Sequence, residues 1–170
     1  MAEQEVIVEE AQLSDAKALV DLLSQVSQET DFVVAETILS QEDMEIFLER
    51  HLESVNEICL VVRVGKELAG VLNVSSTSSP QTNHIGDIFI AVQEKYWGYG
   101  LGSLLMEVAL DWACHTPVIR RLELTVQDRN SRAVHLYEKF GFKIEATKER
   151  GTKTKDGEFL DVYLMSRLID

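Results

Sequence analysis

Three glycines, Gly98, Gly100 and Gly102, are the residues whose type and spacing first suggest chemistry. They lie between an apolar, β-branched stretch (residues 84–92) and a stretch whose leucines recur at helical spacing (residues 101–115). Glycine has no Cβ, so a ligand can lie close to the main chain at such positions. The first turn of a helix adds free N–H groups and the positive end of the helix dipole. This glycine turn (residues 97–102) therefore predicts a site for phosphate or pyrophosphate.

Two common phosphate-binding motifs do not fit this spacing. A P-loop requires Gly-Lys-Ser/Thr after four intervening residues, and the turn contains no such tripeptide. A dinucleotide fingerprint requires glycine or alanine at its sixth position, and counted from Gly98 that position is Ser103. The spacing therefore excludes both of these nucleotide-binding classes.

A second group of residues with chemical potential begins at Asn130 and ends at Phe142. Asn130 is placed to cap a short helix, and Gly141 stands where such a helix would end. Tyr137 lies on this helix between the two. A buried phenol in that position is commonly a packing residue, and it could also donate a proton in catalysis.

The elements that must position these residues follow from apolar periodicity. Helices are expected after Ser14 and after Ser40, as well as over residues 101–115 and 131–140. The order β-α-α-β-β-β-α-β-α-β-β predicts one mixed α/β domain over residues 1–170, with helices on the faces of a central sheet. The expected strands are residues 5–10, 58–64, 68–74, 84–92, 122–126, 142–146 and 159–165, with residues 151–157 as a polar connection before the last.

In these motifs the sequence resembles the GCN5-related N-acetyltransferases, the GNAT family. The glycine turn is similar to the family motif Gln/Arg-x-x-Gly-x-Gly/Ala, with Gly100 and Gly102 at the glycine positions and Trp97 in place of Gln or Arg. Residues 130–142 are similar to Asn-x-x-Ala-x-x-Leu-Tyr-x-x-x-Gly-Phe. The resemblance covers most of the chain and implies a twisted, mostly antiparallel sheet of about seven strands with helices on both faces.

The resemblance also implies acetyl-CoA as the co-substrate and no metal. The pyrophosphate is expected on the N–H groups at the start of the helix, and the pantetheine arm along the edge of the strand that ends at Val92. Asn130 would bind the arm or simply cap its helix. The implied cofactor-binding residues are Ile90, Ala91, Val92, Trp97, Gly98, Tyr99, Gly100, Leu101, Gly102, Ser103 and Asn130.

For catalysis the resemblance places Tyr137 at the general-acid position, where a phenol can protonate the departing thiolate. A protonated amine must also lose a proton before it attacks, so a base is needed. The candidate bases are Asp87 and His84 in the strand, and Glu29 or Asp31 in the loop between the first two helices; Asp87 is the one we name, although it could instead be a surface residue. Residues that could contact the acceptor amine are Glu29, Asp31, Phe32 and His84, although the first three could equally form a polar connection between two helices.

Composition limits the partners. Sixteen basic and 29 acidic residues give a net charge of −13, which argues against nucleic acid and is compatible with a cationic substrate. No apolar run is long enough to cross a bilayer, and the acidic start is unlike a signal peptide, so a cytoplasmic location is expected. Cys59 and Cys114 have no metal or redox spacing and are expected to be reduced core or near-core thiols.

The sequence therefore predicts an acetyl-CoA-dependent N-acetyltransferase in which a primary amine attacks the thioester directly in a ternary complex. The acceptor is a small cationic amine, such as a polyamine or amino-sugar, or a protein amine. The alternative is a non-catalytic CoA-binding module that serves regulation or interaction. Homodimers are common in the family, and the last strand is a plausible contact.

Overall fold

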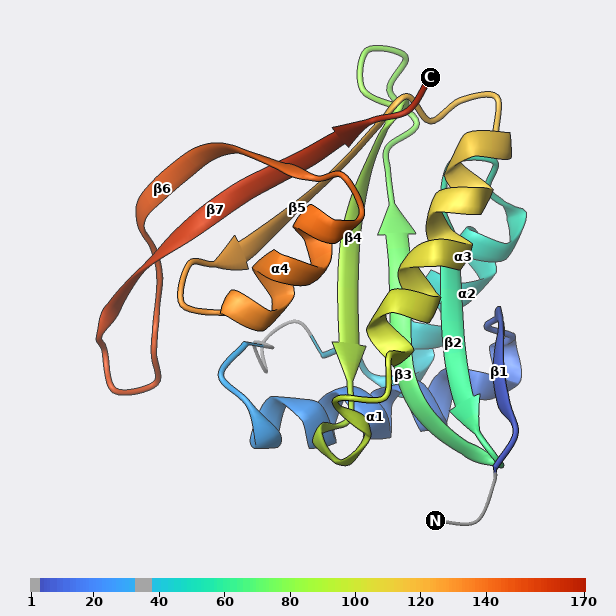
Figure 1. The fold of residues 1–170 in the computed structure, drawn as a ribbon. Helices are drawn as coiled ribbons and strands as arrows, with labels where there is room; N and C mark the ends of the chain where they lie inside the picture. The colour runs from blue at the N-terminus through green and yellow to red at the C-terminus, as the bar shows by residue number, and fades with distance from the viewer. Residues whose placement is uncertain (1–3, 33–37) are drawn as a thin grey trace.

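The computed structural model describes residues 4–32 and 38–170. Within them a single sheet has the strand order β1-β2-β3-β4-β5-β7-β6 (Figure 1). The β4–β5 pair is parallel, and the other neighbouring strands are antiparallel. The strands are β1 (Val6–Glu10), β2 (Ile58–Val64), β3 (Glu67–Ser75), β4 (Ile85–Val92), β5 (Arg121–Gln127), β6 (Lys143–Lys153) and β7 (Phe159–Leu168).

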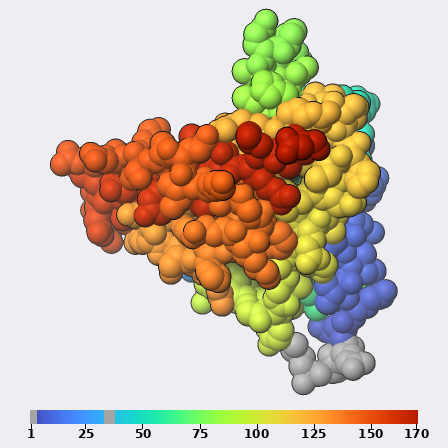
Figure 2. Space-filling view, turned by 45° about the horizontal axis from the view of Figure 1, so that its top comes forward, coloured from blue at the N-terminus to red at the C-terminus, as the bar shows by residue number. Residues whose placement is uncertain are grey.

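Four helices cover the two faces of the sheet. Helices α1 (Ala16–Glu29) and α2 (Gln41–Glu53) pack on one face, and α3 (Leu101–His115) and α4 (Ser131–Lys139) pack on the other (Figure 1). Short 3-10 turns, η1 (Leu13–Asp15) and η3 (Glu94–Tyr96), precede α1 and the glycine turn. The loop between β3 and β4 projects from the body of the molecule, and the β6–β7 hairpin extends to one side (Figures 1 and 2). The element order and the mixed α/β class are as predicted.

Local signals explain most element boundaries. The Ser40 Oγ accepts a hydrogen bond from the Asp43 N–H at 3.1 Å, so this serine caps α2 as expected. Gly141 has φ +87° directly after α4, which confirms its role in ending that helix. The predicted Ser14 cap is wrong, because Gln12 caps η1 instead and its N–H donates to the Asp15 Oδ2 at 2.8 Å.

Strand β6 is longer than the sequence predicted. It continues to Lys153 because register shifts after Ile144 and Lys148 let the ladder with β7 resume at Thr152. Most of β6 is solvent-exposed at the edge of the sheet, so its sequence has no apolar alternation to reveal a strand. Cys59 is buried as expected, whereas Cys114 is exposed on α3.

The parallel pairing of β4 with β5 is short. It consists of Ile85 with Arg121, Gly86 with Leu122 and Asp87 with Glu123. Beyond this point β4 pairs with β3 as far as Val92, while β5 follows β7. The two halves of the sheet therefore diverge, and among the described residues no strand lies beside the β4 main chain after Asp87 on the β5 side.

Gly86 lets the strands meet at this junction. A Cβ at this position would lie 2.5 Å from the Val74 Cγ1 and 3.0 Å from the Leu122 Cδ2, both of which are buried. The lack of a side chain is therefore required by close packing in the core.

We expect Gly86→Ala to lower the free energy of unfolding by about 1–3 kcal/mol, because an extra methyl group overpacks a filled core. Urea unfolding followed by circular dichroism measures this change. If the variant were as stable as the parent, the Val74 and Leu122 side chains would be able to move aside without lowering the free energy of unfolding.

Candidate active site

A cavity of about 860 Å³ opens where β4 and β5 diverge. Its walls come from the ends of β4 and β5, the glycine turn, α4 and the β6–β7 hairpin. This large cavity has the size of a small-molecule site and brings together residues that lie far apart in the sequence. Of the residues predicted from the sequence, it is lined by Phe32, Ile90, Ala91, Val92, Trp97, Gly98, Gly100, Leu101, Gly102, Ser103, Asn130 and Tyr137.

The glycine turn forms one end of the large cavity. Gly98 and Gly100 have φ values of +87° and +78°, a left-handed conformation that disfavours other residues. Gly100 is the N-cap of α3, and the first helical hydrogen bond runs from the Leu104 N–H to its carbonyl at 3.0 Å. No side chain caps this helix, so the N–H groups of its first turn remain available to an anion.

The turn also leaves little room for side chains at its inner side. A Cβ at Gly102 would lie 3.3 Å from the Leu136 Cδ2 of α4. The backbone donors, the helix dipole and the bare glycines together fit a phosphate or pyrophosphate group lying on the start of α3. The donor set therefore suits the diphosphate of a CoA thioester.

Trp97, which departs from the family motif, holds the turn to β4. Its indole Nε1 donates to the Val92 carbonyl at 2.8 Å. The guanidinium of Arg132 lies over the indole, 5.4 Å from the ring centroid, and Arg132 also lines the large cavity. Beside them the Lys139 Nζ lies 3.4 Å from the Ser103 Oγ. Two cations of α4 thus stand close to the glycine turn.

The sequence reasoning missed Arg132 and Lys139. Both lie within the stretch 130–142 that carries the second family motif, and both stand out as basic residues in a strongly acidic chain. Asking which cations that motif holds could have identified them. Their positions favour an anionic ligand although the chain as a whole repels anions.

Carboxylates hold the turn before the glycines in place. Glu67 accepts hydrogen bonds from the Tyr96 hydroxyl and from the Lys95 Nζ, the latter at 2.8 Å, and the Lys95 bond is the main cause of its lowered pKa. On the other side the Glu29 Oε2 accepts from the Glu94 N–H at 3.0 Å. The other Glu29 oxygen is buried, with no partner among the described residues. Glu29, a predicted acceptor contact, thus supports η3.

Tyr137 and Asn130 are placed by α4. The Asn130 Oδ1 accepts from the Ala133 N–H at 3.3 Å, so Asn130 caps the helix while it lines the large cavity. The Tyr137 side chain is 6% exposed and packs beside Phe142, with 6.1 Å between ring centroids. Burial raises the pKa of the Tyr137 phenol, which therefore remains protonated and able to donate.

Asp87 lies at the last paired position before β4 and β5 diverge, opposite Glu123. It is not among the described residues that line the large cavity. The Asp87 side chain is solvent-exposed, but desolvation by the surrounding protein, with a smaller effect from the Glu123 carboxylate, raises its pKa to about 6. Such a carboxylate is basic enough to accept a proton near neutral pH.

The remaining predicted contacts are spread around the site. His84 lies just before β4, and its carbonyl accepts from the Arg120 and Arg121 N–H groups at 2.9 and 3.1 Å. The Asp31 carbonyl accepts from the Gln127 Nε2 at 3.1 Å. Phe32 lines the large cavity, whereas Tyr99 points into solvent and is 61% exposed.

Residues 4–32 and 38–170 show neither a metal site nor a membrane-spanning helix. Within this part of the chain, no group of three or more His, Cys, Asp or Glu side chains is arranged so that it could hold a metal ion. None of the helices in this part of the chain combines the length and the apolar character that a membrane crossing needs.

Comparisons with known proteins agree with this geometry. Residues 19–142 match the model of the acetyltransferase (GNAT) family. The match covers the glycine turn, the diverging strands and α4, and we conclude that the chain belongs to this family of N-acetyltransferases.

Among curated proteins, the chain is similar to the L-amino acid N-acetyltransferase of Escherichia coli, at 30% identity over 109 residues, which span 64% of this chain and 67% of the relative. Among solved structures, a GNAT-family acetyltransferase from Streptococcus pneumoniae superposes with a TM-score of 0.94 at 46% identity, covering 97% of this chain and 100% of that one. The fold is also that of spermidine N-acetyltransferase from Vibrio cholerae, solved with CoA and spermine, at 21% identity and a TM-score of 0.78 over 96% of this chain and 95% of that one.

We expect Arg132→Gln to weaken CoA binding by about 3- to 30-fold, because the loss of one charge-assisted contact costs on the order of 1–2 kcal/mol. Isothermal titration calorimetry with CoA measures the effect, which should shrink as salt is added. Arg50→Gln on the opposite face of the sheet makes the same charge change and should leave the affinity unaltered. Equal losses in both variants would contradict the placement of Arg132.

Proposed function

We propose that this protein transfers the acetyl group of acetyl-CoA to a primary amine by direct attack in a ternary complex. The observation that carries the proposal is the large cavity, which has an uncapped helix N-terminus at one end and a buried phenol in its wall. The helix N-terminus can bind a diphosphate, and the phenol can protonate a leaving thiolate. Family membership and the CoA complex of a structural neighbour support the same co-substrate.

Acetyl-CoA binding would rest on the chain's own main-chain groups. The N–H groups of the first turn of α3 would hold the pyrophosphate, with Arg132 and Lys139 adding positive charge. The pantetheine amides would lie along β4 from Ile88 to Val92, where β5 has moved away and the strand edge is open. A main-chain N–H on this edge would polarise the thioester carbonyl.

When bound, acetyl-CoA supplies an acetyl thioester, from which acetyl passes to the amine nitrogen as the carbon–sulfur bond breaks. Tyr137 would donate the proton of its hydroxyl to the departing sulfur, and the second proton that the nitrogen releases as the amide forms would restore the phenol. Because burial raises the pKa of this phenol, it holds its proton throughout the neutral range. The low exposure of Tyr137 also keeps bulk water from supplying that proton.

Asp87 would take up the proton that the attacking ammonium must lose. Its pKa of about 6 means that the carboxylate is mostly ionised at pH 7 and still basic. Asp87 lies at the point where β4 and β5 diverge but does not line the large cavity, so the proton would reach it through one water molecule.

The acceptor of this reaction is a small amine or a protein amine. Curated relatives are named for amino acids and for spermidine, which are small amines, and two structural neighbours are named for ribosomal proteins. A CoA-binding module without catalysis remains the alternative. Turnover assayed as CoA release with a panel of amines distinguishes an enzyme from a module.

We expect Tyr137→Phe to lower kcat by about 10- to 1,000-fold while CoA affinity changes little, because general acid catalysis contributes on the order of 10²–10⁴-fold. Initial rates of CoA release give kcat, and calorimetry gives the affinity. Phe140→Leu, a change to a half-buried aromatic of the same segment, is the control for packing. If the phenylalanine variant turned over at the parent rate at every pH, Tyr137 would have no part in the mechanism.

We expect kcat/KM to rise with pH through a limb near 6 that reports ionisation of Asp87, and this limb should be absent in Asp87→Asn. Stability should respond in the opposite sense. The pKa of Asp87 is raised on folding, so its ionisation destabilises the native state as pH rises from the unfolded value of 3.8 through about 6.

At pH 7 the Asp87→Asn variant should therefore melt at a slightly higher temperature than the parent, and at pH 3 the two should melt together. Glu123→Gln provides the comparison, because it removes the neighbouring charge and should shift the limb to lower pH. An asparagine variant that keeps both the limb and full activity would exclude Asp87 as the base.

A further inference from the structure

A second and smaller cavity, of about 170 Å³, lies on the other face of the sheet beneath α1 and α2. We call it the small pocket. Leu19 and Leu23 of α1, Met44 and Phe47 of α2, and Asn73 and Phe89 of the sheet contribute to its lining. We infer that the small pocket receives the apolar side chain of the acceptor, so that the acceptor is a primary amine carrying an aliphatic or aromatic group. This inference rests on the proposed acetyl transfer.

The size of the small pocket fits such a group. An apolar cavity of about 150 Å³ stays dry and admits a benzene ring. A pocket of about 170 Å³ can therefore hold a side chain as large as that of leucine or phenylalanine. Leu19 and Met44 are 1% and 4% exposed, so the void reaches into an otherwise filled core. Because such a void costs stability when empty, its presence beside a reactive cavity favours a ligand.

The small pocket adjoins the large cavity. The half-buried Phe89 of β4 lines both of them. On α1, Leu23 faces the small pocket and Val26, about one helical turn further on, faces the large cavity. An amine held near the thioester can thus direct its substituent past Phe89 into the small pocket.

The uncharged lining of the small pocket disfavours an acceptor that carries a second positive charge. Among its described lining residues, none carries a formal charge at neutral pH. Burial raises the pKa of Cys59 to about 12, so this lining thiol also stays neutral. A polyamine would leave an ammonium group unpaired in the pocket, and that is costly. An uncharged substituent is favoured instead.

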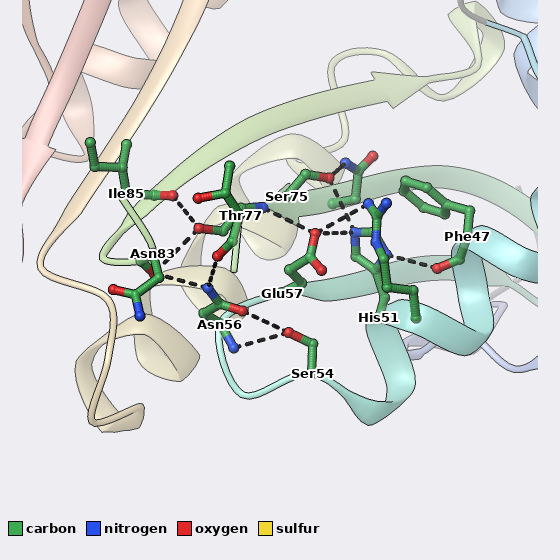
Figure 3. Close-up of polar contacts among 12 residues, drawn as sticks. Phe47, His51, Ser54, Asn56, Glu57, Ser75, Thr77, Asn83 and Ile85 are labelled. Carbon is green, nitrogen blue, oxygen red and sulfur yellow. Dashed lines mark hydrogen bonds and ion pairs between the residues drawn. The ribbon is translucent and has the colours of Figure 1, made fainter. Parts of the chain in front are cut away.

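A partly buried polar network runs beside the small pocket and includes two of its lining residues. The Asn73 Nδ2 donates to the Ser75 Oγ at 3.1 Å, and the Ser75 Oγ lies 3.1 Å from the His51 Nε2 (Figure 3). The other ring nitrogen of His51 lies 2.8 Å from the Phe47 carbonyl oxygen. Burial lowers the pKa of His51, whose ring is therefore neutral and donates from Nδ1. His51 thus links Asn73 of the sheet, through Ser75, to the main chain of Phe47, and its ring also packs on the Phe47 ring with 3.9 Å between centroids.

The test compares acceptors that differ in their side chain. With saturating acetyl-CoA, we expect kcat/KM for leucinamide and phenylalaninamide to exceed that for glycinamide by at least about tenfold, and spermidine to give no advantage. Leu39→Trp places a large ring at the half-buried rim of the small pocket and should reduce this preference to less than about threefold. Leu13→Trp makes the same change at an exposed leucine outside the lining and should preserve it.

A binding measurement makes the result independent of turnover. Leucinamide titrated into the CoA-loaded protein should bind to the parent and to Leu13→Trp, and should bind at least about tenfold more weakly to Leu39→Trp. Leu23→Ala, which enlarges the pocket, should shift the preference from leucinamide to phenylalaninamide. Free leucine and a peptide that begins with leucine distinguish the two sources of such an amine, since better use of the peptide indicates an N-terminal residue and better use of leucine indicates a free amino acid.

The outcomes separate the inference from the proposed function. Acetyl transfer that favours spermidine, or that ignores the side chain, would overturn the assignment of the small pocket and leave the transferase function intact. Leucinamide binding that Leu39→Trp abolishes, without acetyl transfer to any amine, would support the pocket and overturn the transferase function.

Discussion

The structure depends on where two parallel strands stop pairing. β4 and β5 share hydrogen bonds over three residue pairs, and after Asp87 and Glu123 each strand keeps only its antiparallel neighbour. An unpaired main chain inside a protein needs other partners for its donors and acceptors. Here the gap becomes the large cavity, and in the proposed function the open edge of β4 would pair with the amides of the pantetheine arm. The placement of α3, α4 and the β6–β7 hairpin around that gap completes the site.

Local chemistry accounts for the parts that the sequence predicted. The apolar periodicity of α3, the glycines before it and the caps of α2 and α4 are all decided within a few residues. The glycine turn at the start of α3 was predicted for the same reason, since a helix N-terminus preceded by glycine can be recognised without knowledge of the fold. Tyr137 needed the family motif, because its burial follows from contacts with residues such as Phe142 rather than from its own surroundings in the chain.

The parts that were missed depend on long-range contacts. The later part of β6, residues 147–153, carries no alternation, and only its ladder with β7 reveals it as a strand. Glu29 was predicted to face the acceptor, yet it bonds to Glu94, 65 positions away. The small pocket is formed by two helices and the sheet, and its members look like ordinary core residues when they are considered one at a time. Such features arise from packing in three dimensions, which periodicity does not encode.

Helix α1 contacts both the small pocket and the residues before the glycine turn, and this has a thermodynamic consequence. Leu19 and Leu23 line the small pocket, while Gln25 bonds to Gln93 and Glu29 bonds to Glu94, directly before the glycine turn. A displacement of α1 by an occupant of the pocket would therefore reach the glycine turn, where the diphosphate of acetyl-CoA is proposed to bind. By linkage, the two substrates must then alter each other's affinity by the same factor. The helix is thus a physical route for cooperativity between the acceptor and acetyl-CoA.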